Sequence, residues 1–180
     1  MSQRDSGYER KERDLYETPE WVTEALLPHL PAHEGFVWEP ACGSGKMSKV
    51  LKKRFAVISS DIAPNYPGAH TQDFITIGEY SHPGCAAVIT NPPYDLAVDF
   101  IKTALNMPEK PTVAMLLRTD FDHAKSREIL FGRNRQFMRK IVLTKRIRWF
   151  EDSKGSPSFN HAWFIWDWDN HEPPTLAYGP

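Results

Sequence analysis

The sequence lacks the features of a secreted, membrane-spanning or metal-binding protein. It has no run of eighteen apolar residues, so no transmembrane helix is predicted. Residues 1–14 are polar and contain no apolar segment of a secretory signal. The two cysteines, Cys42 and Cys85, lie far apart, and the seven histidines occur singly rather than at metal-ligand spacing. These absences predict a cytoplasmic protein with reduced thiols, no bound metal and no membrane partner.

What is present is an alternation of short apolar runs with amphipathic segments, in 180 residues that fit one domain. Thr18 is the expected N-cap of the first helix, and a short strand is expected before Asp73. The order of elements predicts an α/β fold in which helices cover both faces of a mostly parallel sheet. Further strands are predicted at 36–40, 56–60, 86–90, 112–117, 139–144 and 161–168, and helices at 18–30, 46–54, 95–105 and 123–131.

The segment EPACGSGK, which begins at Glu39, places a glycine-rich turn between a predicted strand and a predicted helix. A phosphate-binding Walker loop would need glycine where the chain has Pro40 and a hydroxyl where it has Met47, so that interpretation fails twice. Gly43 and Gly45 instead permit a tight turn that a ligand can approach closely. The carboxylate of Glu39 beside this turn would repel pyrophosphate but attract an ammonium or sulfonium group.

Two further carboxylates follow the next strands. Asp61 ends the second predicted strand, where its side chain can accept hydrogen bonds from ribose hydroxyls. Asp73 follows the expected third strand and can accept from an adenine amino group. Each aspartate alone is more often a helix cap or a solvated loop residue. In series with Glu39, however, they predict a pocket for a cationic adenosyl amino acid, S-adenosylmethionine.

The segment NPPY directly follows the predicted strand at 86–90, which puts Asn91 at the carboxyl edge of the sheet. The Asn91 side-chain oxygen and the Pro92 carbonyl can both accept hydrogen bonds from one NH2 group. Such acceptance localises the nitrogen lone pair of a base amine or an amide, and so favours in-line transfer of a methyl group. Tyr94 offers a ring on which a planar target can stack. In isolation the two prolines would indicate only a rigid turn, but their place downstream of the glycine loop favours a catalytic role.

Together the motifs YETPEWV, EPACGSG, SSDI, QDFI, ITNPPYD and RIRWF resemble the class I S-adenosylmethionine-dependent amino-methyltransferases, especially small phage and prophage N6-adenine DNA methyltransferases. The resemblance covers most of the chain. It implies a Rossmann-like, mostly parallel seven-stranded sheet with a closing antiparallel strand. It also implies S-adenosylmethionine as cofactor and S-adenosylhomocysteine as product. Residues 1–14 would form a flexible polar arm, and residues 15–180 a single catalytic domain without a separate target-recognition domain.

The same resemblance assigns roles to residues along the whole chain. Catalysis falls to Asn91, Pro92, Pro93 and Tyr94. Cofactor binding falls to Thr18, Trp21, Glu39, Ala41, Cys42, Gly43, Gly45, Asp61, Ile62, Asp73, Phe74 and Asn91.

Basic residues concentrate in the second half of the chain. From Arg118 to Arg148 there are ten basic and three acidic residues, a local charge of +7 in a protein whose net charge is −1. Such a patch is typical of a surface that contacts nucleic-acid phosphates, and a solvated basic face is the alternative. The patch supplies four candidate substrate-binding residues, Arg133, Arg135, Arg146 and Arg148.

The segment 146–164 is predicted to be a long loop between the two closing strands, and long loops in compact domains are often functional. A duplex adenine must be flipped out to reach Asn91, so aromatic residues are expected to stack on it. Trp149, Phe150 and Phe159 are the candidates in this loop, although Trp149 and Phe150 could also be core residues.

These patterns predict methylation of the exocyclic amino group of adenine, with DNA favoured over RNA as the partner. Adenine in RNA or a glutamine side chain in a protein would suit the same NPPY chemistry. A non-catalytic binding module that keeps the cofactor fold is the alternative from a different functional class.

Overall fold

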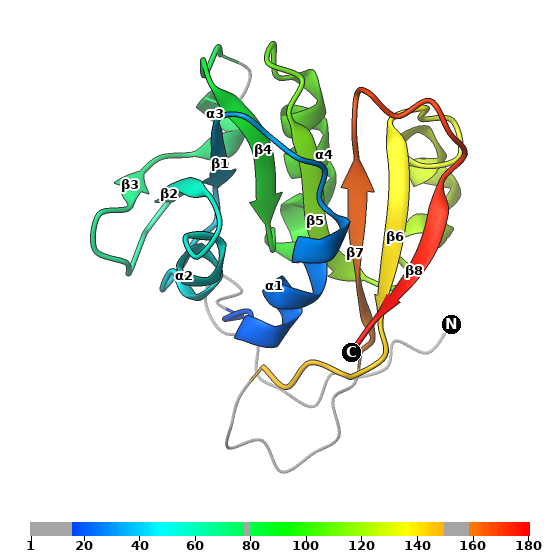
Figure 1. Ribbon diagram of the computed structural model, residues 1–180, viewed down its shortest axis with the longest axis horizontal. Helices are drawn as coiled ribbons and strands as arrows, with labels where there is room; N and C mark the ends of the chain where they lie inside the picture. The colour runs from blue at the N-terminus through cyan, green and yellow to red at the C-terminus, as the bar shows by residue number, and fades with distance from the viewer. Residues whose placement is uncertain (1–15, 78–79, 150–158) are drawn as a thin grey trace.

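The computed structural model describes residues 16–77, 80–149 and 159–180, and these form an eight-stranded sheet with helices on both faces (Figure 1). The strand order is β3-β2-β1-β4-β5-β7-β6-β8. The sheet confirms the predicted α/β, Rossmann-like class and adds one strand, β8, to the seven expected. The strands are β1 (Phe36–Glu39), β2 (Ala56–Asp61), β3 (His70–Thr71), β4 (Cys85–Thr90), β5 (Thr112–Arg118), β6 (Phe137–Leu143), β7 (His161–Trp166) and β8 (Thr175–Gly179).

Strand direction decides which residues meet at one edge of the sheet. β1 pairs in parallel with β2 and β4, and the parallel pairing continues to β3 and β5. β7 is antiparallel to both β5 and β6, so β6 points the same way as β5. β8 pairs in parallel with β6. The carboxyl ends of β1, β2, β4, β5 and β6 therefore share one edge with the start of β7, the lower edge of the sheet in Figure 1.

The two faces of the sheet are buried by different helices. Because successive side chains of a strand point to opposite faces, Val37 packs into one apolar cluster and Trp38 into the other. Burial on both faces explains why the central strands appear in the sequence as continuous apolar runs. One face carries α1 (Glu20–Leu26), η2 (Leu27–His29) and α2 (Lys46–Leu51), and the other carries α3 (Phe74–Ile77), η3 (Tyr94–Leu96), α4 (Ala97–Asn106), η4 (Phe121–His123) and η5 (Lys125–Leu130).

The α-helix predicted at 123–131 is wrong in type. The chain forms two 3₁₀ segments, η4 and η5, separated by Ala124 in an extended conformation (φ −81°, ψ 133°). The Arg127 side chain donates a hydrogen bond to the Phe121 carbonyl, and its guanidinium lies 4.2 Å from the Phe121 ring centroid. The extended backbone at Ala124 interrupts the helical dihedral angles, so the segment does not wind as one α-helix.

Other boundaries differ by a few residues. α1 has Pro19 as its N-cap rather than Thr18, whose hydroxyl accepts a hydrogen bond from Asn91 instead. β7 ends at Trp166, two residues before the predicted end of that strand. β8 was not predicted, since this edge strand has only exposed and half-buried residues and so no continuous apolar run.

The arm predicted for residues 1–14 lies outside the described residues, and the single catalytic domain at 15–180 stays a prediction. Within the part of the chain that the structure describes, no helix is long and apolar enough to cross a membrane.

Candidate active site

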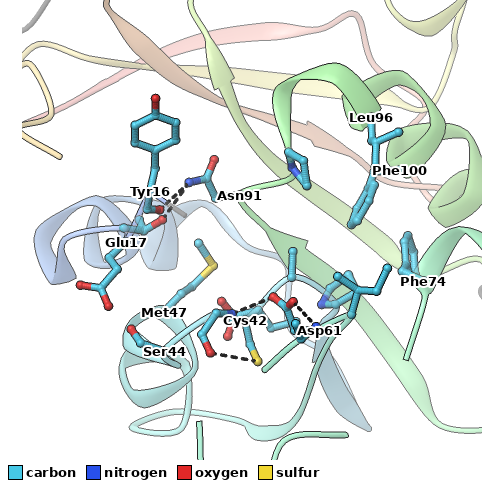
Figure 2. Close-up of a pocket in the computed structure, with 18 of the residues that line it drawn as sticks. Tyr16, Glu17, Cys42, Ser44, Met47, Asp61, Phe74, Asn91, Leu96 and Phe100 are labelled. Atoms are coloured by element: carbon cyan, nitrogen blue, oxygen red, sulfur yellow. Dashed lines mark hydrogen bonds between the residues drawn. The ribbon is translucent and has the colours of Figure 1, made fainter. Parts of the chain in front are cut away.

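A cavity of about 490 Å³ opens at the carboxyl edge of the sheet (Figure 2). Four parts of the chain build its walls: the segment before α1, the loop between β1 and α2, the residues after β2 and β3, and the NPPY segment after β4. Gly43 and Asn91, the two places where the sequence predicted the methyl donor and the methyl acceptor, line this same cavity.

Most of the predicted cofactor-binding residues reach the cavity wall, namely Thr18, Glu39, Ala41, Cys42, Gly43, Asp61, Ile62, Asp73, Phe74 and Asn91. Their roles in binding stay predictions. Trp21 and Gly45 are not part of the wall. The Trp21 ring packs against the apolar cluster beneath α1 and lies 5.1 Å from Lys145 Nζ, so the structure does not support its predicted contact with the cofactor. Gly45 serves instead as the N-cap residue of α2.

The glycine loop is held by side-chain and main-chain contacts to the end of β2. Gly43 and Gly45 have φ values of 49° and 75°, a left-handed conformation that glycine adopts without strain. The Gly43 N–H donates to Asp61 Oδ2 at 2.9 Å, and its carbonyl accepts from the Asn65 N–H at 3.0 Å. The other oxygen of Asp61 accepts from the Ala63 N–H at 2.9 Å. Asp61 therefore shapes the loop, and each of its oxygens keeps a second lone pair for a ligand hydroxyl.

Glu39 lines the cavity and is buried, with only 2% of the residue exposed. It accepts a hydrogen bond from the Ser48 hydroxyl, which lies 2.6 Å from the Ser59 hydroxyl. Burial raises the pKa of Glu39 to about 8, the Ser48 hydrogen bonds oppose this rise, and the charge of Asp61 adds to it. A cation in the cavity would favour the ionised form of Glu39 and bring its pKa down again.

Cys42, beside Glu39, is a neutral thiol rather than a thiolate. Burial raises its pKa to about 12, and the charges of Glu39 and Asp61 act in the same direction. Because the thiolate is the nucleophilic form, Cys42 serves as a small apolar part of the wall. Among the residues that the structure describes, no three His, Cys, Asp or Glu side chains are placed to hold a metal ion.

The wall formed by Phe74, Leu96 and Phe100 is apolar (Figure 2). The rings of Phe74 and Phe100 have centroids 5.1 Å apart, and Phe74 is 2% exposed. Leu96 is 42% exposed and Ile62 is 67% exposed, although both line the cavity. These side chains offer apolar surface to a planar ligand.

Asp73 caps a helix as well as lining the cavity. Its two carboxylate oxygens accept from the Ile75 N–H at 3.1 Å and from the Thr76 hydroxyl at 2.9 Å, at the first turn of α3. The helix-cap interpretation of this aspartate therefore describes part of its role. Its remaining lone pairs are those that an adenine amino group would use.

The side chain of Asn91 is oriented by the segment before α1. Its Nδ2 lies 3.3 Å from the Tyr16 carbonyl and 3.2 Å from Thr18 Oγ1, and it donates to both (Figure 2). An amide nitrogen carries two donors and the amide oxygen carries the acceptor lone pairs. With both N–H groups engaged, Oδ1 is left to accept hydrogen bonds from a substrate.

The two prolines after Asn91 differ in their carbonyls. The Pro93 carbonyl accepts from the Leu96 N–H at 3.0 Å and starts η3. Pro92 is a buried residue, and no main-chain N–H of the described residues donates to its carbonyl. The Pro92 carbonyl thus keeps its acceptor capacity beside Asn91.

Four rings form an aromatic cluster next to Asn91, made of Tyr16, Tyr94, Trp149 and His161. The Tyr94 hydroxyl lies 2.6 Å from His161 Nε2. The Tyr16 ring centroid lies 5.4 Å from Trp149 and 6.3 Å from Tyr94. Trp149 meets the His161 ring edge-on at 5.1 Å. Trp149 also packs against the apolar cluster beneath α1, as the core interpretation expected, and its stacking on a target base stays a prediction.

The four predicted substrate-binding arginines lie at opposite edges of the sheet. Arg146 and Arg148 follow β6 and lie at the edge that carries the cavity, and Arg146 donates to Asn160 Oδ1 at 3.0 Å. Arg133 and Arg135 precede β6, so they lie at the far edge, where Arg133 pairs with Glu128 at 3.0 Å. The structure therefore does not bring Arg133 and Arg135 to the edge that carries the cavity, and their contact with the nucleic acid stays a prediction.

Of the remaining loop aromatics, Phe159 lies 4.0 Å beneath the guanidinium of Arg118, at the edge that carries the cavity. Phe150 lies outside the described residues.

Several residues of the cavity and the cluster were missed by the sequence interpretation, among them Tyr16, Leu96, Phe100 and His161. Leu96 and Phe100 carried a signal, since they occupy positions i and i+4 directly after NPPY and so share one helix face. Tyr16 also carried a signal, since it is the first residue of the motif YETPEWV. Nothing local marks His161, because its place depends on which strands become neighbours.

Neither a protein-family model nor a curated protein matches the sequence. The structure is nevertheless similar to solved methyltransferases. ErmE, a 23S rRNA methyltransferase, has a TM-score of 0.56 and 17% identity, over 85% of this chain and 68% of its own. The methyltransferase subunit of a type I restriction-modification system from Streptococcus thermophilus has a TM-score of 0.53 and 12% identity, over 82% of this chain and 42% of its own. A Listeria monocytogenes protein assigned to the class I S-adenosylmethionine-dependent methyltransferases has a TM-score of 0.54 and 12% identity, over 87% of this chain and 62% of its own.

These similarities define the fold, which is that of the class I S-adenosylmethionine-dependent methyltransferases. The chain spans less than two thirds of the Streptococcus and Listeria proteins. What those proteins act on therefore does not follow from the shared fold, and function has to be argued from the site.

Proposed function

We propose that this chain transfers a methyl group from S-adenosylmethionine to the exocyclic amino group of adenine, with DNA as the favoured polymer. The orientation of the Asn91 amide carries the proposal. With Nδ2 bound to Tyr16 and Thr18, Oδ1 is the side-chain atom left to accept a hydrogen bond from the target amine. A flipped amide would present N–H groups to an NH2 group, which cannot hydrogen-bond that way.

The cavity has the chemistry that S-adenosylmethionine requires. The apolar wall of Phe74, Leu96 and Phe100 suits the adenine ring, and Asp61 offers acceptors for ribose hydroxyls. Glu39, whose burial disfavours its charge in the absence of a cation, suits the positively charged amino acid end. When bound, S-adenosylmethionine would supply the methyl group and leave as S-adenosylhomocysteine.

The proposed chemistry needs acceptors rather than a strong base. Asn91 Oδ1 and the Pro92 carbonyl would each accept one N–H of the target amine, which localises the nitrogen lone pair. The N–C bond would form as the S–C bond breaks, and the extra proton would then leave the nitrogen for solvent. The acceptors also stabilise the positive charge that develops on nitrogen, an effect of the kind that typically contributes about 10²- to 10³-fold to a rate.

The surroundings of Asn91 support a nucleic-acid target. The aromatic cluster offers rings to an extruded base, and Arg146 and Arg148 offer cationic groups to phosphates at the same edge of the sheet. RNA is the second candidate polymer, because ErmE acts on 23S rRNA and covers 85% of this chain in the comparison. The matching restriction-modification subunit favours DNA.

The test is to incubate the protein with labelled S-adenosylmethionine and mixed DNA and RNA, followed by mass spectrometry of the nucleosides. The wild type should produce N6-methyladenine in DNA. Asn91→Ala should lower the rate by about 100-fold or more while cofactor affinity stays within about threefold. Asn106→Ala, an exposed residue at the end of α4 and away from the cavity, is the matched control and should behave as the wild type. Label on protein alone would contradict the adenine assignment, and label on RNA alone would select the second candidate.

A further inference from the structure

Tyr94 and His161 are 67 positions apart in the chain, but their side chains meet at the carboxyl edge of the sheet. Tyr94 begins η3 directly after the prolines, and His161 is the first residue of β7. The Tyr94 hydroxyl lies 2.6 Å from Nε2 of His161, the short distance of a strong hydrogen bond. His161 is 2% exposed, so water does not compete for this contact.

The imidazole of His161 is neutral under ordinary conditions. Its pKa is lowered to about 4, mainly by burial and also by the positive charge of Arg118, against opposing effects of the Phe159 main chain and Asp120. A neutral imidazole has one ring nitrogen that donates and one that accepts. Because a phenol is the stronger donor and an imidazole nitrogen the stronger acceptor, the Tyr94 hydroxyl donates to Nε2.

His161 also contacts the second large ring of the aromatic cluster. The Trp149 ring lies 5.1 Å from His161 at an interplanar angle of 83°, a favourable edge-to-face arrangement. His161 of β7 is paired with Arg118 of β5, so the main chain of His161 belongs to the sheet and not to a loop. A residue of the rigid sheet thus supports both Tyr94 and Trp149.

We propose that His161 is a positioning residue, which holds the Tyr94 hydroxyl and thereby fixes the ring on which the target base stacks. Stacking depends on the plane of the ring, and an untethered tyrosine must give up rotamer freedom when a base binds. The tether removes that freedom before the base arrives. The catalytic consequence rests on the proposed function, whereas the tether itself is a property of the free protein.

The kinetic test compares Tyr94→Phe, His161→Phe, His161→Gln and the double variant Y94F/H161F in the full chain. Loss of the hydrogen bond in Y94F or H161F should raise KM for the nucleic acid roughly 3- to 10-fold while cofactor affinity stays unchanged. The double variant should be no worse than either single variant, because both remove the same contact. His161→Gln, which keeps an amide oxygen near the position of Nε2, should restore KM to within about twofold.

Tyr178→Phe is the matched control, since this tyrosine is 65% exposed on the edge strand β8 and should leave KM unchanged. Additive losses in the double variant would overturn the proposal. So would a wild-type KM in H161F, or a Gln variant as impaired as the Phe variant. If H161F does not fold, Y94F still tests the proposal, because it removes the tyrosine hydroxyl of the same hydrogen bond.

A second measurement needs no methyl transfer. In wild-type protein labelled with ¹⁵N-histidine, the Nε2 resonance of His161 should be that of an unprotonated, hydrogen-bonded nitrogen, and it should shift in Y94F but not in Y178F. An unchanged resonance in Y94F would disprove the tether even if adenine is methylated. A shifted resonance in a protein that methylates no nucleic acid would contradict the proposed function and uphold the tether.

Discussion

The side-chain nitrogen of Asn91 lies 3.2 Å from the hydroxyl of Thr18, although the two residues are 73 positions apart in the chain. The Tyr16 carbonyl receives the second hydrogen bond from this nitrogen at 3.3 Å. The amide of the NPPY segment is therefore oriented by residues outside that segment. Because a target amine must meet Oδ1 rather than Nδ2, the chain before α1 is part of the proposed catalytic site.

Thr18→Val tests this orientation. Valine has the shape of threonine but no hydroxyl, so Asn91 loses one of its two acceptors and its amide can turn. We expect kcat to fall about 2- to 10-fold, the value of one hydrogen bond, with little change in thermal stability. Thr23→Val is the matched control, since the buried Thr23 hydroxyl has no hydrogen-bond partner among the described residues. Equal losses in the two variants, measured by steady-state kinetics, would contradict the orienting role of Thr18.

Glu39 should make stability depend on pH. Its pKa is raised from 4.5 to about 8, so between these values the folded protein holds a proton that the unfolded chain has released. The stabilising contribution is full below pH 4.5 and is lost as the pH rises toward 8. The thermal midpoint of the wild type should therefore fall relative to that of Glu39→Gln between pH 5 and pH 8. Parallel midpoint curves for the two proteins would show that Glu39 is ionised in the free protein.

The two arginine pairs at opposite edges of the sheet offer a charge-matched test of the nucleic-acid surface. Replacing Arg146 and Arg148 with alanine should weaken DNA binding and reduce the slope of log K against log salt by about 0.9 for each lost phosphate contact. Replacing Arg133 and Arg135 removes the same charge at the far edge and should leave the slope nearly unchanged. Fluorescence anisotropy at several salt concentrations measures both, and the reverse ranking would place the nucleic acid at the other edge.

Alanine substitutions at Gly45 and Gly68 distinguish the effect of backbone strain on stability from the effect of steric overlap. Their φ values are 75° and 83°, so alanine is strained at either position by about 1–2 kcal/mol. A Cβ at Gly45 would overlap the Tyr66 ring, whereas a Cβ at Gly68 would have nothing within 4 Å. Gly45→Ala should therefore lower the free energy of unfolding by about 2–5 kcal/mol, clearly more than Gly68→Ala. Urea denaturation measures the difference, and equal losses would mean that Tyr66 moves aside freely.

The elements predicted best from sequence were those whose pattern is local. The central strands β4 and β5 were located within a residue, because a strand buried on both faces is a continuous apolar run. The glycine loop and NPPY were expected at the carboxyl edge because each directly follows such a strand. Prediction was poorest at 123–131, where an extended Ala124 separates two 3₁₀ segments and no α-helix forms.

By itself the sequence determined the class of fold and the positions of the glycine loop and the NPPY segment, since apolar periodicity and turn residues act over a few neighbouring positions. The tertiary structure decided which way the Asn91 amide faces, that Tyr94 meets His161, and that Arg133 and Arg135 lie away from the cavity. Each of these depends on the order and direction of strands in the sheet. Strand pairing joins segments dozens of residues apart, so no local pattern encodes it.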